Sequence, residues 1–204
     1  KTIQNFKYHI SNIWEPSSRI ERITELLNSK PVQSKEDFKK YQNDFVSPYA
    51  KKLTTYITSA FDSVKITDKN LGLALELLKN WDYEMDAKSQ VPTIYTRFFQ
   101  YLVKNIFEDE MGDDLVKEYV FLANLPYRIV PKMLEENGSS FFDDIRTPQV
   151  ETRDDIIRKS LVDALSQLEK NYGMEIANWQ WGEIHKVTFK HMFHNASSLL
   201  DKLI

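Results

Sequence analysis

The chain has 204 residues, a formal net charge of -3 and a sequence pI of about 5.9, and its length is enough to bury a core in one large or two small domains. Its basic residues are interleaved with acidic ones, which argues against nucleic acid as a partner, and its apolar runs are far shorter than the roughly 20 residues of a membrane span. The absence of Cys excludes disulfides, thiolate metal sites and a cysteine nucleophile.

The first segment, residues 1–16, is predicted to be an extended lead-in because it is aromatic, weakly periodic and ends at Pro16, which does not fit inside a helix. From Ser17 onward, apolar residues recur at helical spacing and predict a short amphipathic helix. Ser17 or Ser18 is available as its N-cap. The predicted apolar face consists of Ile20, Ile23, Leu26 and Leu27.

Three further helices follow before residue 82. The sequence SKED at 34–37 resembles a capping box, with Asp37 in place of the usual Glu, and predicts a helix start. Pro48 interrupts or restarts that helix, and apolar spacings of three and four continue to Phe61. Residues 71–81 are apolar on most sides, which predicts a helix through the middle of the domain.

The remaining helices carry clear start and stop signals. Pro92 fits the first turn of a helix whose wide apolar stripe continues to Ile106. The final long helix has Thr152 as its N-cap and Gly173 just past its end. That helix is predicted at 153–171, and two others are predicted at about 113–124 and 127–136.

The non-helical segments complete the predicted architecture. Residues 136–151 contain an Asn-Gly turn signal and predict a loop, whereas the alternation in HKVTFKHMF, residues 185–193, favours a short strand. We therefore predict an all-α, multi-helix fold with short extended or β segments at both ends. Its predicted parts are the lead-in 1–16, a helical domain 17–173 and a return segment 174–204.

The tail holds three of the chain's four His, at 185, 191 and 194, with Glu183 as a possible oxygen ligand for zinc. Their spacing fits no standard metal motif, and on a strand His185 and His191 would lie roughly 20 Å apart. We therefore expect no metal here. His185 is expected to form hydrogen bonds among packed Trp side chains.

The stretch WDYEMDAKSQVP invites a calcium interpretation, because Asp82, Glu84 and Asp86 alternate as the early ligands of an EF-hand loop do. The sixth position is Ala87 where Gly is needed, and the twelfth is Thr93 where a bidentate Glu is needed. We predict an acidic turn that ends one helix and leads into the next.

No phosphate-binding glycine motif and no GxSxG nucleophile motif occurs in the sequence. Arg19 and Arg22 lie three residues apart on one helix face, with Glu21 and Glu25 nearby. Taken alone, that pattern is typical of a surface ion-pair cluster, which contributes little stability.

Three stretches, SRIERITELL, LLKNWDYEMDAKSQVPTIYTRF and NWQWGEIHKVTFKH, occur in this order over almost the whole chain. Together they resemble the β-chain of the penicillin acylase (penicillin amidase) family. That family has a comparable R-x-x-R-I segment, then L-x-x-W-D-x-x-M-x-x-x-S, then W-x-W-G-x-x-H-x-x-x-x-x-H. The matching motif positions here are Trp81, Asp82, Trp179, Trp181, Gly182, His185 and His191.

The resemblance implies an N-terminal nucleophile hydrolase, made as a periplasmic or secreted precursor that cuts itself so that a new terminal Ser becomes the nucleophile of an amidase. Arg19 matches the Arg that helps to order the active-site network in family members. The chain would be a helical segment excised from an αββα enzyme. The implied partners are the remaining α-chain and β-chain segments and a small acyl-amide substrate.

The sequence also departs from the family pattern. It begins with Lys1 rather than Ser, and the oxyanion Asn is expected just upstream; Asn5 and Asn12 are within range but lack the family's surroundings. Some members carry a calcium-binding Asp in the lead-in, where this sequence has Tyr8 or His9. We expect no cofactor in this segment, with calcium possible in the full-length enzyme.

Two functional hypotheses follow from the sequence. In the first, the chain is a structural and pocket-shaping segment of an amidohydrolase and is inactive alone. In the alternative, it is an autonomous helical protein-interaction module that binds a partner through exposed aromatic residues. The end segments 1–16 and 174–204 distinguish them: an excised segment should leave them frayed or self-associated, whereas a module should bury them in a monomer.

Overall fold

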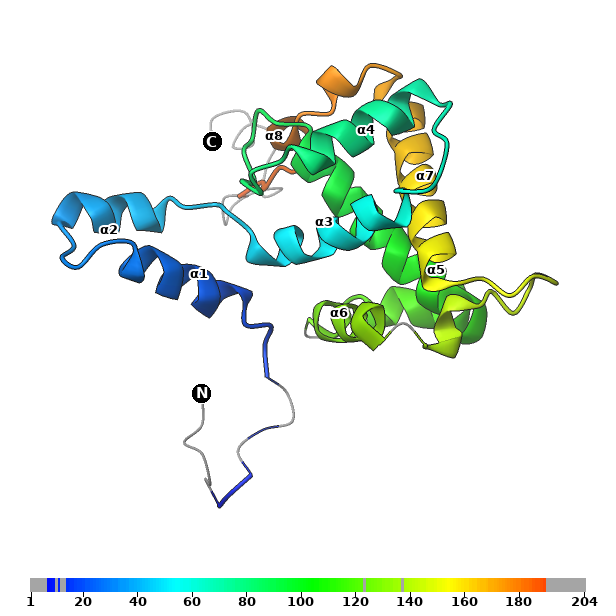
Figure 1. The fold of residues 1–204 in the computed structure, drawn as a ribbon, viewed down its shortest axis with the longest axis horizontal. Helices are drawn as coiled ribbons and strands as arrows, with labels where there is room; N and C mark the ends of the chain where they lie inside the picture. The colour runs from blue at the N-terminus through cyan, green and yellow to red at the C-terminus, as the bar shows by residue number, and fades with distance from the viewer. Residues whose placement is uncertain (1–6, 10, 12–13, 123, 137, 190–204) are drawn as a thin grey trace, which may run out of the picture.

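The computed structural model describes residues 7–9, 11, 14–122, 124–136 and 138–189 (Figure 1). In this described part the only β feature is an isolated antiparallel bridge between Val46 and Glu84, so the predicted all-α fold is confirmed. The helices are α1 (Ser18–Asn28), α2 (Lys35–Gln42), α3 (Pro48–Ala60), α4 (Lys69–Lys79), α5 (Val91–Tyr119), α6 (Leu125–Glu136), α7 (Arg153–Tyr172) and α8 (Trp181–Ile184), with 3₁₀ turns η1 (Ser140–Phe142) and η2 (Ile176–Asn178).

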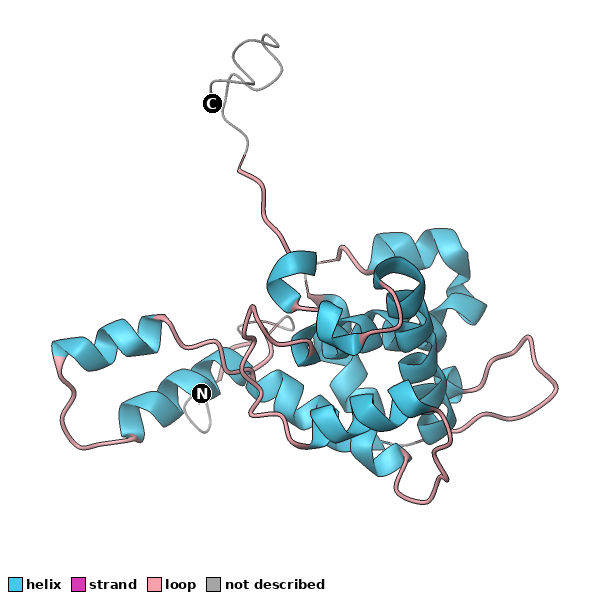
Figure 2. Ribbon diagram, turned by 90° about the horizontal axis from the view of Figure 1, so that it is seen from above, coloured by secondary structure: helices cyan, strands magenta, loops and turns pink. Residues whose placement is uncertain are grey.

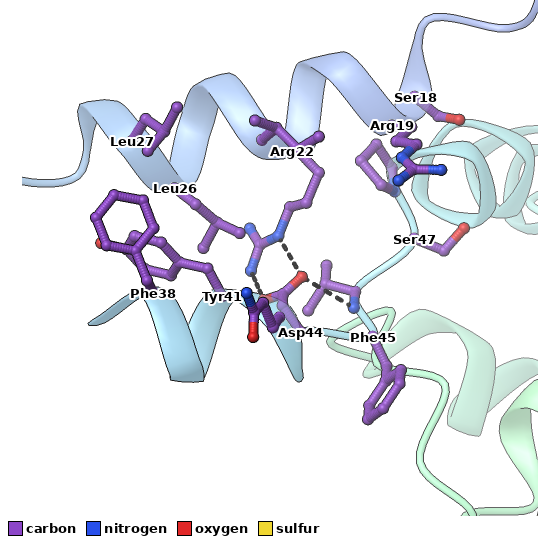
Figure 3. A pocket seen from close by; sticks show the side chains of 14 residues that line it. Ser18, Arg19, Arg22, Leu26, Leu27, Phe38, Tyr41, Asp44, Phe45 and Ser47 are labelled. Carbon is purple, nitrogen blue, oxygen red and sulfur yellow. Dashed lines mark hydrogen bonds and ion pairs between the residues drawn. The ribbon is translucent and has the colours of Figure 1, made fainter. Parts of the chain in front are cut away.

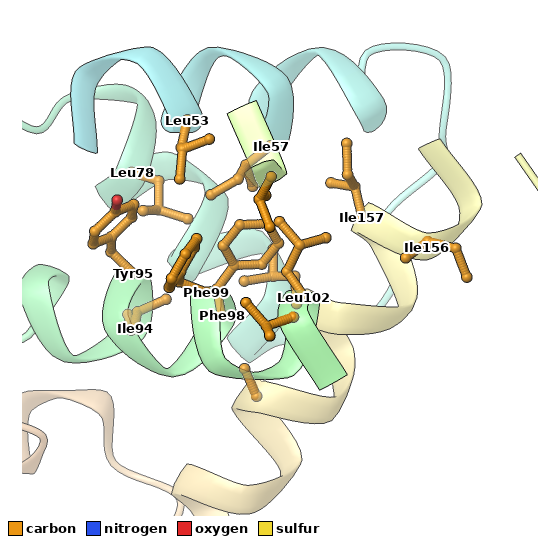
Figure 4. Packing of buried hydrophobic residues seen from close by; sticks show 14 of the residues in the cluster. Leu53, Ile57, Leu78, Ile94, Tyr95, Phe98, Phe99, Leu102, Ile156 and Ile157 are labelled. Carbon is orange, nitrogen blue, oxygen red and sulfur yellow. The ribbon is translucent and has the colours of Figure 1, made fainter. Parts of the chain in front are cut away.

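Helix α5 is the centre of the fold and packs against α4, α6, α7 and α8, with its most extensive contact on α7. Its apolar stripe faces side chains from several helices, as Figure 4 shows. Burial of each large apolar side chain contributes about 1.5–3 kcal/mol, so this cluster supplies most of the stabilisation. Its fully buried members include Leu53 and Ile57 from α3, Leu78 from α4, Phe98 and Leu102 from α5, and Ile156 and Ile157 from α7.

The helix predicted to start at Pro92 and the one predicted at 113–124 are joined in the structure as α5. Gly112 separates the two halves, with φ 77° and ψ 157°. A positive φ of this size is accessible to Gly at little cost, so the helix axis bends there. The second half ends at Tyr119, earlier than predicted, because the next residues form turns: Phe121 N–H donates to the Glu118 carbonyl at 3.1 Å.

The prediction that residues 71–81 run through the middle of the domain is wrong. Helix α4 buries only Ala74 and Leu78, and Leu73 is 39% exposed. Its main neighbours are α3, α5 and α7, which leave part of its surface uncovered. An all-round apolar pattern shows that a helix has few polar side chains, but the position of its neighbours decides how much of it is buried.

Local capping signals are mostly confirmed. Ser34 and Asp37 form the predicted capping box of α2, and Thr152 forms the corresponding box of α7 with Asp155. Ser17 precedes α1 but does not cap it, because its backbone is already in the helical region and its hydroxyl donates to Glu21 instead. A cap residue needs extended backbone for its side chain to reach the free amides of the first turn.

Helices α1 and α2, residues 18–42, form an arm that projects from the body of the molecule, which comprises α3 to α8, residues 48–184 (Figure 2). Neither arm helix contains a fully buried residue. The loop at 143–152 extends on the opposite side of the body (Figure 1). The arm and the body are therefore held by different kinds of interaction.

The strand predicted at 185–193 is absent from its described part, since residues 185–189 have no regular structure. The rest of that stretch, including His191, lies outside the described residues. The segment before it is packed on the body, with Ile176 only 4% exposed and Trp179 fully buried.

Candidate functional site

A groove of about 660 Å³ lies between α1, α2 and the segment 43–47 that joins α2 to α3, which we call the link (Figure 3). Most of its wall is apolar, with Ile23 and Leu26 from α1 and Phe38 from α2. Arg19 lines the end of the groove nearest Ser47, as Figure 3 shows. The groove therefore combines an apolar wall with a cation at one end.

Arg19, to which the family resemblance assigns a supporting role in an active-site network, is exposed. Within the described part of the chain it forms no hydrogen bond or ion pair. A guanidinium carries five N–H donors in a planar fork. All of them are consequently available to an acceptor from outside the described residues.

Arg22 lies one turn after Arg19 and forms a two-point ion pair with Asp44 in the link. Nε donates to Asp44 Oδ1 at 2.8 Å and Nη2 donates to Asp44 Oδ2 at 2.6 Å. The two side chains are only 21% and 15% exposed. The hydrogen bonds from Arg22 lower the pKa of the Asp44 carboxyl, and the same contact raises the pKa of Arg22, so both groups are charged at neutral pH.

The link is attached to the body through backbone hydrogen bonds. Ser47 N–H donates to the Tyr83 carbonyl at 2.9 Å, and Met85 N–H donates to the Phe45 carbonyl at 3.1 Å. These bonds flank the bridge between residues 46 and 84. The Ser47 hydroxyl also caps α3 by accepting from Ala50 N–H at 3.1 Å. The carboxylate that holds α1 is therefore fixed to the rigid body.

The acidic stretch that follows α4 is a turn, as predicted, and its carboxylates accept backbone hydrogen bonds. Asp82 Oδ1 accepts from Glu84 N–H at 3.0 Å, and Asp86 Oδ1 accepts from Lys88 N–H at 3.0 Å. Trp81 Nε1–H donates to the Glu84 carbonyl at 3.0 Å. These side chains shape the turn that supports the link.

The tail motif contacts the same turn. Trp181 N–H donates to the Ser89 carbonyl at 2.9 Å and Gly182 N–H donates to the Ala87 carbonyl at 2.8 Å. A Cβ on Gly182 would lie 2.9 Å from the Ala87 Cβ, closer than real Cβ atoms approach, so Gly is required for this contact. We call these contacts, with the turn at 86–89, the clip.

The two Trp of the tail pack as predicted. Trp179 is fully buried and its Nε1–H donates to the Gly173 carbonyl at 3.0 Å. The His185 ring stacks on Trp181 with 4.3 Å between ring centroids and 8° between planes. His185 backbone N–H donates to the Trp181 carbonyl at 2.8 Å, and among the described residues its side chain stacks on the Trp181 ring and has no hydrogen-bond partner. Packing thus explains these residues.

No group of three or more His, Asp or Glu side chains suited to a metal ion occurs in the described part of the chain. His191 and His194 lie outside it, so the earlier zinc alternative is not tested at those positions. Glu183 forms an ion pair with Lys186 at 2.7 Å. Tyr8 and His9 carry no carboxylate and hence do not fit the oxygen-rich set that calcium prefers.

A second groove, of about 590 Å³, lies on the other side of the first turn of α1 and is bounded by α3 and α6. Ser18 and Pro48 line both grooves. Tyr127 stacks on Phe99 in this region, with 4.7 Å between ring centroids. The first turn of α1 is therefore a wall shared by two grooves, and its position determines the shape of both.

Sequence reasoning missed the role of Arg22 and Asp44. The spacing of Arg22 and Glu25 predicts a local surface ion pair, which is present at 2.8 Å. The stronger contact with Asp44 joins residues 22 positions apart, and no local pattern indicates it. Asp44 lies in a short segment between helices, where an acidic residue is common in turns.

Comparison with known proteins identifies related chains. A model of the penicillin amidase family matches residues 1–202. Proteins named acyl-homoserine lactone acylase QuiP are similar to this chain, with 29% identity in Pseudomonas syringae pv. tomato, 28% in Pseudomonas aeruginosa and 30% in Pseudomonas fluorescens Pf0-1. These alignments cover 90%, 91% and 89% of this chain. The chain spans 24% of the length of each relative.

Among the helices of the described residues, none combines the length and apolar character that a bilayer span requires.

Proposed function

The chain belongs to the penicillin amidase family, and from this premise we propose that it is one segment of a larger amidohydrolase that cleaves linear amide bonds. The observation that carries the proposal is the family match through residues 1–202, together with acylase relatives of which this chain spans only 24%. Most of the enzyme, including its sheet core, then lies in other parts of the precursor.

The chemistry proposed for the whole enzyme is acyl transfer to a terminal Ser. The Ser hydroxyl attacks the amide carbonyl carbon, and its own α-amino group accepts the hydroxyl proton. Backbone N–H groups and an Asn side chain stabilise the oxyanion, after which the amine leaves with a proton and water hydrolyses the acyl-enzyme. The nucleophile and the oxyanion Asn are contributed by segments outside these 204 residues.

Arg19 is the residue through which this chain contributes to the site. Its guanidinium is exposed and has no acceptor within the described residues, although it lies at the end of a groove. Covering an unpaired charge costs several kcal/mol, so a segment that packs over this groove must provide acceptors for it. Arg19 then orders the hydrogen-bond network around the nucleophile, while the remaining helices shape one side of the pocket.

The proposed substrate class is an amide with an acyl chain, and the names of the relatives point to N-acyl-homoserine lactones as the first candidates. The proposal includes a periplasmic or secreted precursor that cuts itself. Calcium remains an addition for the full-length enzyme only, because the lead-in residues Tyr8 and His9 provide no carboxylate for it.

The test is to express the complete gene and measure hydrolysis of N-acyl-homoserine lactones and a phenylacetyl amide. We expect the processed enzyme to be active, and Arg19→Ala to lower kcat by about 100-fold, the scale associated with misplaced catalytic groups. The isolated 204-residue chain should be inactive. Amide hydrolysis by the purified isolated chain would contradict the proposal, as would full activity of Arg19→Ala.

A second candidate function is supported by the exposed apolar surface of the arm, where Ile20 is 61% and Phe45 in the link 58% exposed. An autonomous interaction module would use this surface to bind another protein. Light scattering and limited proteolysis of the isolated chain separate the two candidates. A protease-resistant monomer favours the module, whereas self-association or cleavage within the arm favours a segment of a larger fold.

A further inference from the structure

We infer that Arg22 and Asp44 are positioning residues for Arg19, because their two-point contact sets the place of the first turns of α1 relative to the body. The inference rests on the proposed function, in which Arg19 supports the active site. It concerns two residues that the family resemblance does not assign to the site.

Helix α1 contacts α3 of the body, but it buries little apolar surface there. Helix α1 has no fully buried residue, and its apolar face remains open, with Ile23 41% and Leu27 42% exposed. Contacts of this kind lack direction, so they do not determine how far α1 is rotated or translated. A directional contact is needed to fix it.

The contact between Arg22 and Asp44 is directional. Two N–H···O bonds of 2.8 and 2.6 Å in one plane hold the guanidinium and the carboxylate in a single relative orientation. A third bond, from Nη1 to Glu25 at 2.8 Å, fixes the guanidinium against its own helix. A lysine would keep the charge but lose this planar fork.

Asp44 lies in the link, which is hydrogen-bonded to the body. Its Oδ1 also accepts from Val46 N–H at 3.3 Å, and the link is bonded to the turn at 83–85. That turn continues into the clip that Trp181 and Gly182 form. A series of hydrogen bonds therefore connects the body, through the link, to Arg22.

The position of Arg22 determines that of Arg19. Residues three apart lie on the same face of a helix, so Arg19 follows any rotation of Arg22 about the axis. Figure 3 shows both side chains directed toward the link from successive turns. The first turn of α1 is also the wall between two grooves, so a shift there would change both.

The test uses the complete processed enzyme and compares Arg22→Lys with Asp44→Asn. Both variants should lower kcat by about 10-fold or more while KM stays within about 2-fold, because a group displaced by about 1 Å loses transition-state contacts and not ground-state binding. Arg22→Asp combined with Asp44→Arg restores an ion pair in the opposite order and should recover part of the lost kcat.

The matched control is Lys30→Gln, which removes an ion pair with Asp37 at the far end of the same arm. It should lower the melting temperature no more than Arg22→Lys does and leave kcat unchanged. If Arg22→Lys changes kcat no more than Lys30→Gln does, the inference is wrong. Arg22→Lys keeps charge and length, so it tests the idea even if Asp44→Asn does not fold.

The Arg19→Ala variant separates the proposed role of Arg19 from the positioning role of Arg22 and Asp44. If Arg19→Ala leaves activity unchanged, the proposed function of Arg19 fails and the positioning inference fails with it. If Arg19→Ala lowers kcat but Arg22→Lys and Asp44→Asn do not, only the positioning inference fails.

Discussion

The arm and the body are stabilised by different kinds of contact. The body surrounds α5 with apolar side chains, many of which are inaccessible to solvent, whereas the arm contains no fully buried residue and is held by caps and ion pairs. Nondirectional burial stabilises a fold strongly, and directional polar contacts place individual groups accurately. The candidate catalytic residue Arg19 lies on the arm, where placement matters more than burial.

The strongest test of this comparison uses the same residue type in both regions. Phe98 in α5 is 1% exposed, and Phe38 in α2 is 49% exposed. We expect Phe98→Ala to cost about 3–5 kcal/mol of unfolding free energy, because a large buried ring leaves a cavity. Phe38→Ala should cost less than about 1 kcal/mol. Urea unfolding followed by circular dichroism measures both, and equal losses would contradict the division.

The clip provides the next test. Gly182→Ala brings a methyl group within 2.9 Å of the Ala87 Cβ and 3.1 Å of the Ala87 carbonyl oxygen. We expect a loss of about 2 kcal/mol from overpacking. Gly138→Ala is the control, because its nearest atom would lie at an ordinary 3.6 Å. Thermal unfolding should give a lower melting temperature for Gly182→Ala than for Gly138→Ala. Equal melting temperatures would show that the clip adjusts to the added methyl group at little cost.

The Arg22 contact should make the stability of the arm depend on pH. Hydrogen bonds from Arg22 lower the folded-state pKa of Asp44 below its ordinary value of 3.8. Its contribution, about 1.5 kcal/mol for charged hydrogen bonds, is present above about pH 4 and is lost as pH falls through the lowered pKa.

Asp44→Asn should remove this loss at acid pH, whereas Asp62→Asn, at an exposed position, should leave it unchanged. Protease cleavage within the arm, measured between pH 7 and pH 3, reports the effect locally. An identical acid response in wild type and Asp44→Asn would mean that another carboxylate controls the arm.

The smallest expected effect separates a real cap from an apparent one. Thr152 accepts from Asp155 N–H at 3.3 Å in a capping box, so Thr152→Ala should cost about 1 kcal/mol. Ser17 does not cap α1, so Ser17→Ala should change stability by less than about 0.5 kcal/mol. Thermal unfolding gives both values, and a larger loss from Ser17→Ala would reverse the assignment.

Much of the fold follows from local sequence patterns. Apolar spacing located α1, α3 and both halves of α5, and the polar residues Ser34 and Thr152 marked helix starts correctly. These signals work because helix formation and capping involve residues within four positions of each other. The wrong prediction, that residues 71–81 lie at the centre, concerns contacts between distant residues. Whether α5 or α4 is central depends on which helices surround each one.

The candidate site shows the same division. Motif similarity pointed to Arg19 and to the Trp-rich tail, but no sequence pattern brings the turn at 86–89 onto Trp181 and Gly182. Their contact spans about half of the chain, and a single sequence contains no spacing rule for pairs so far apart. The sequence likewise predicts a polar role for the His185 side chain, but no pattern in it indicates that this ring stacks on Trp181.

The sequence by itself determined where most helices lie, that the fold is helical, and which family the chain resembles, because periodicity, caps and ordered motifs are properties of neighbouring residues. Only the tertiary structure decided that Asp44 holds Arg22 and that the turn after α4 supports both the link and the clip. It also placed Arg19 at the end of a groove, with no acceptor among the residues that the structure describes. Those features arise from contacts between distant segments, and such contacts form only when the core has placed the helices.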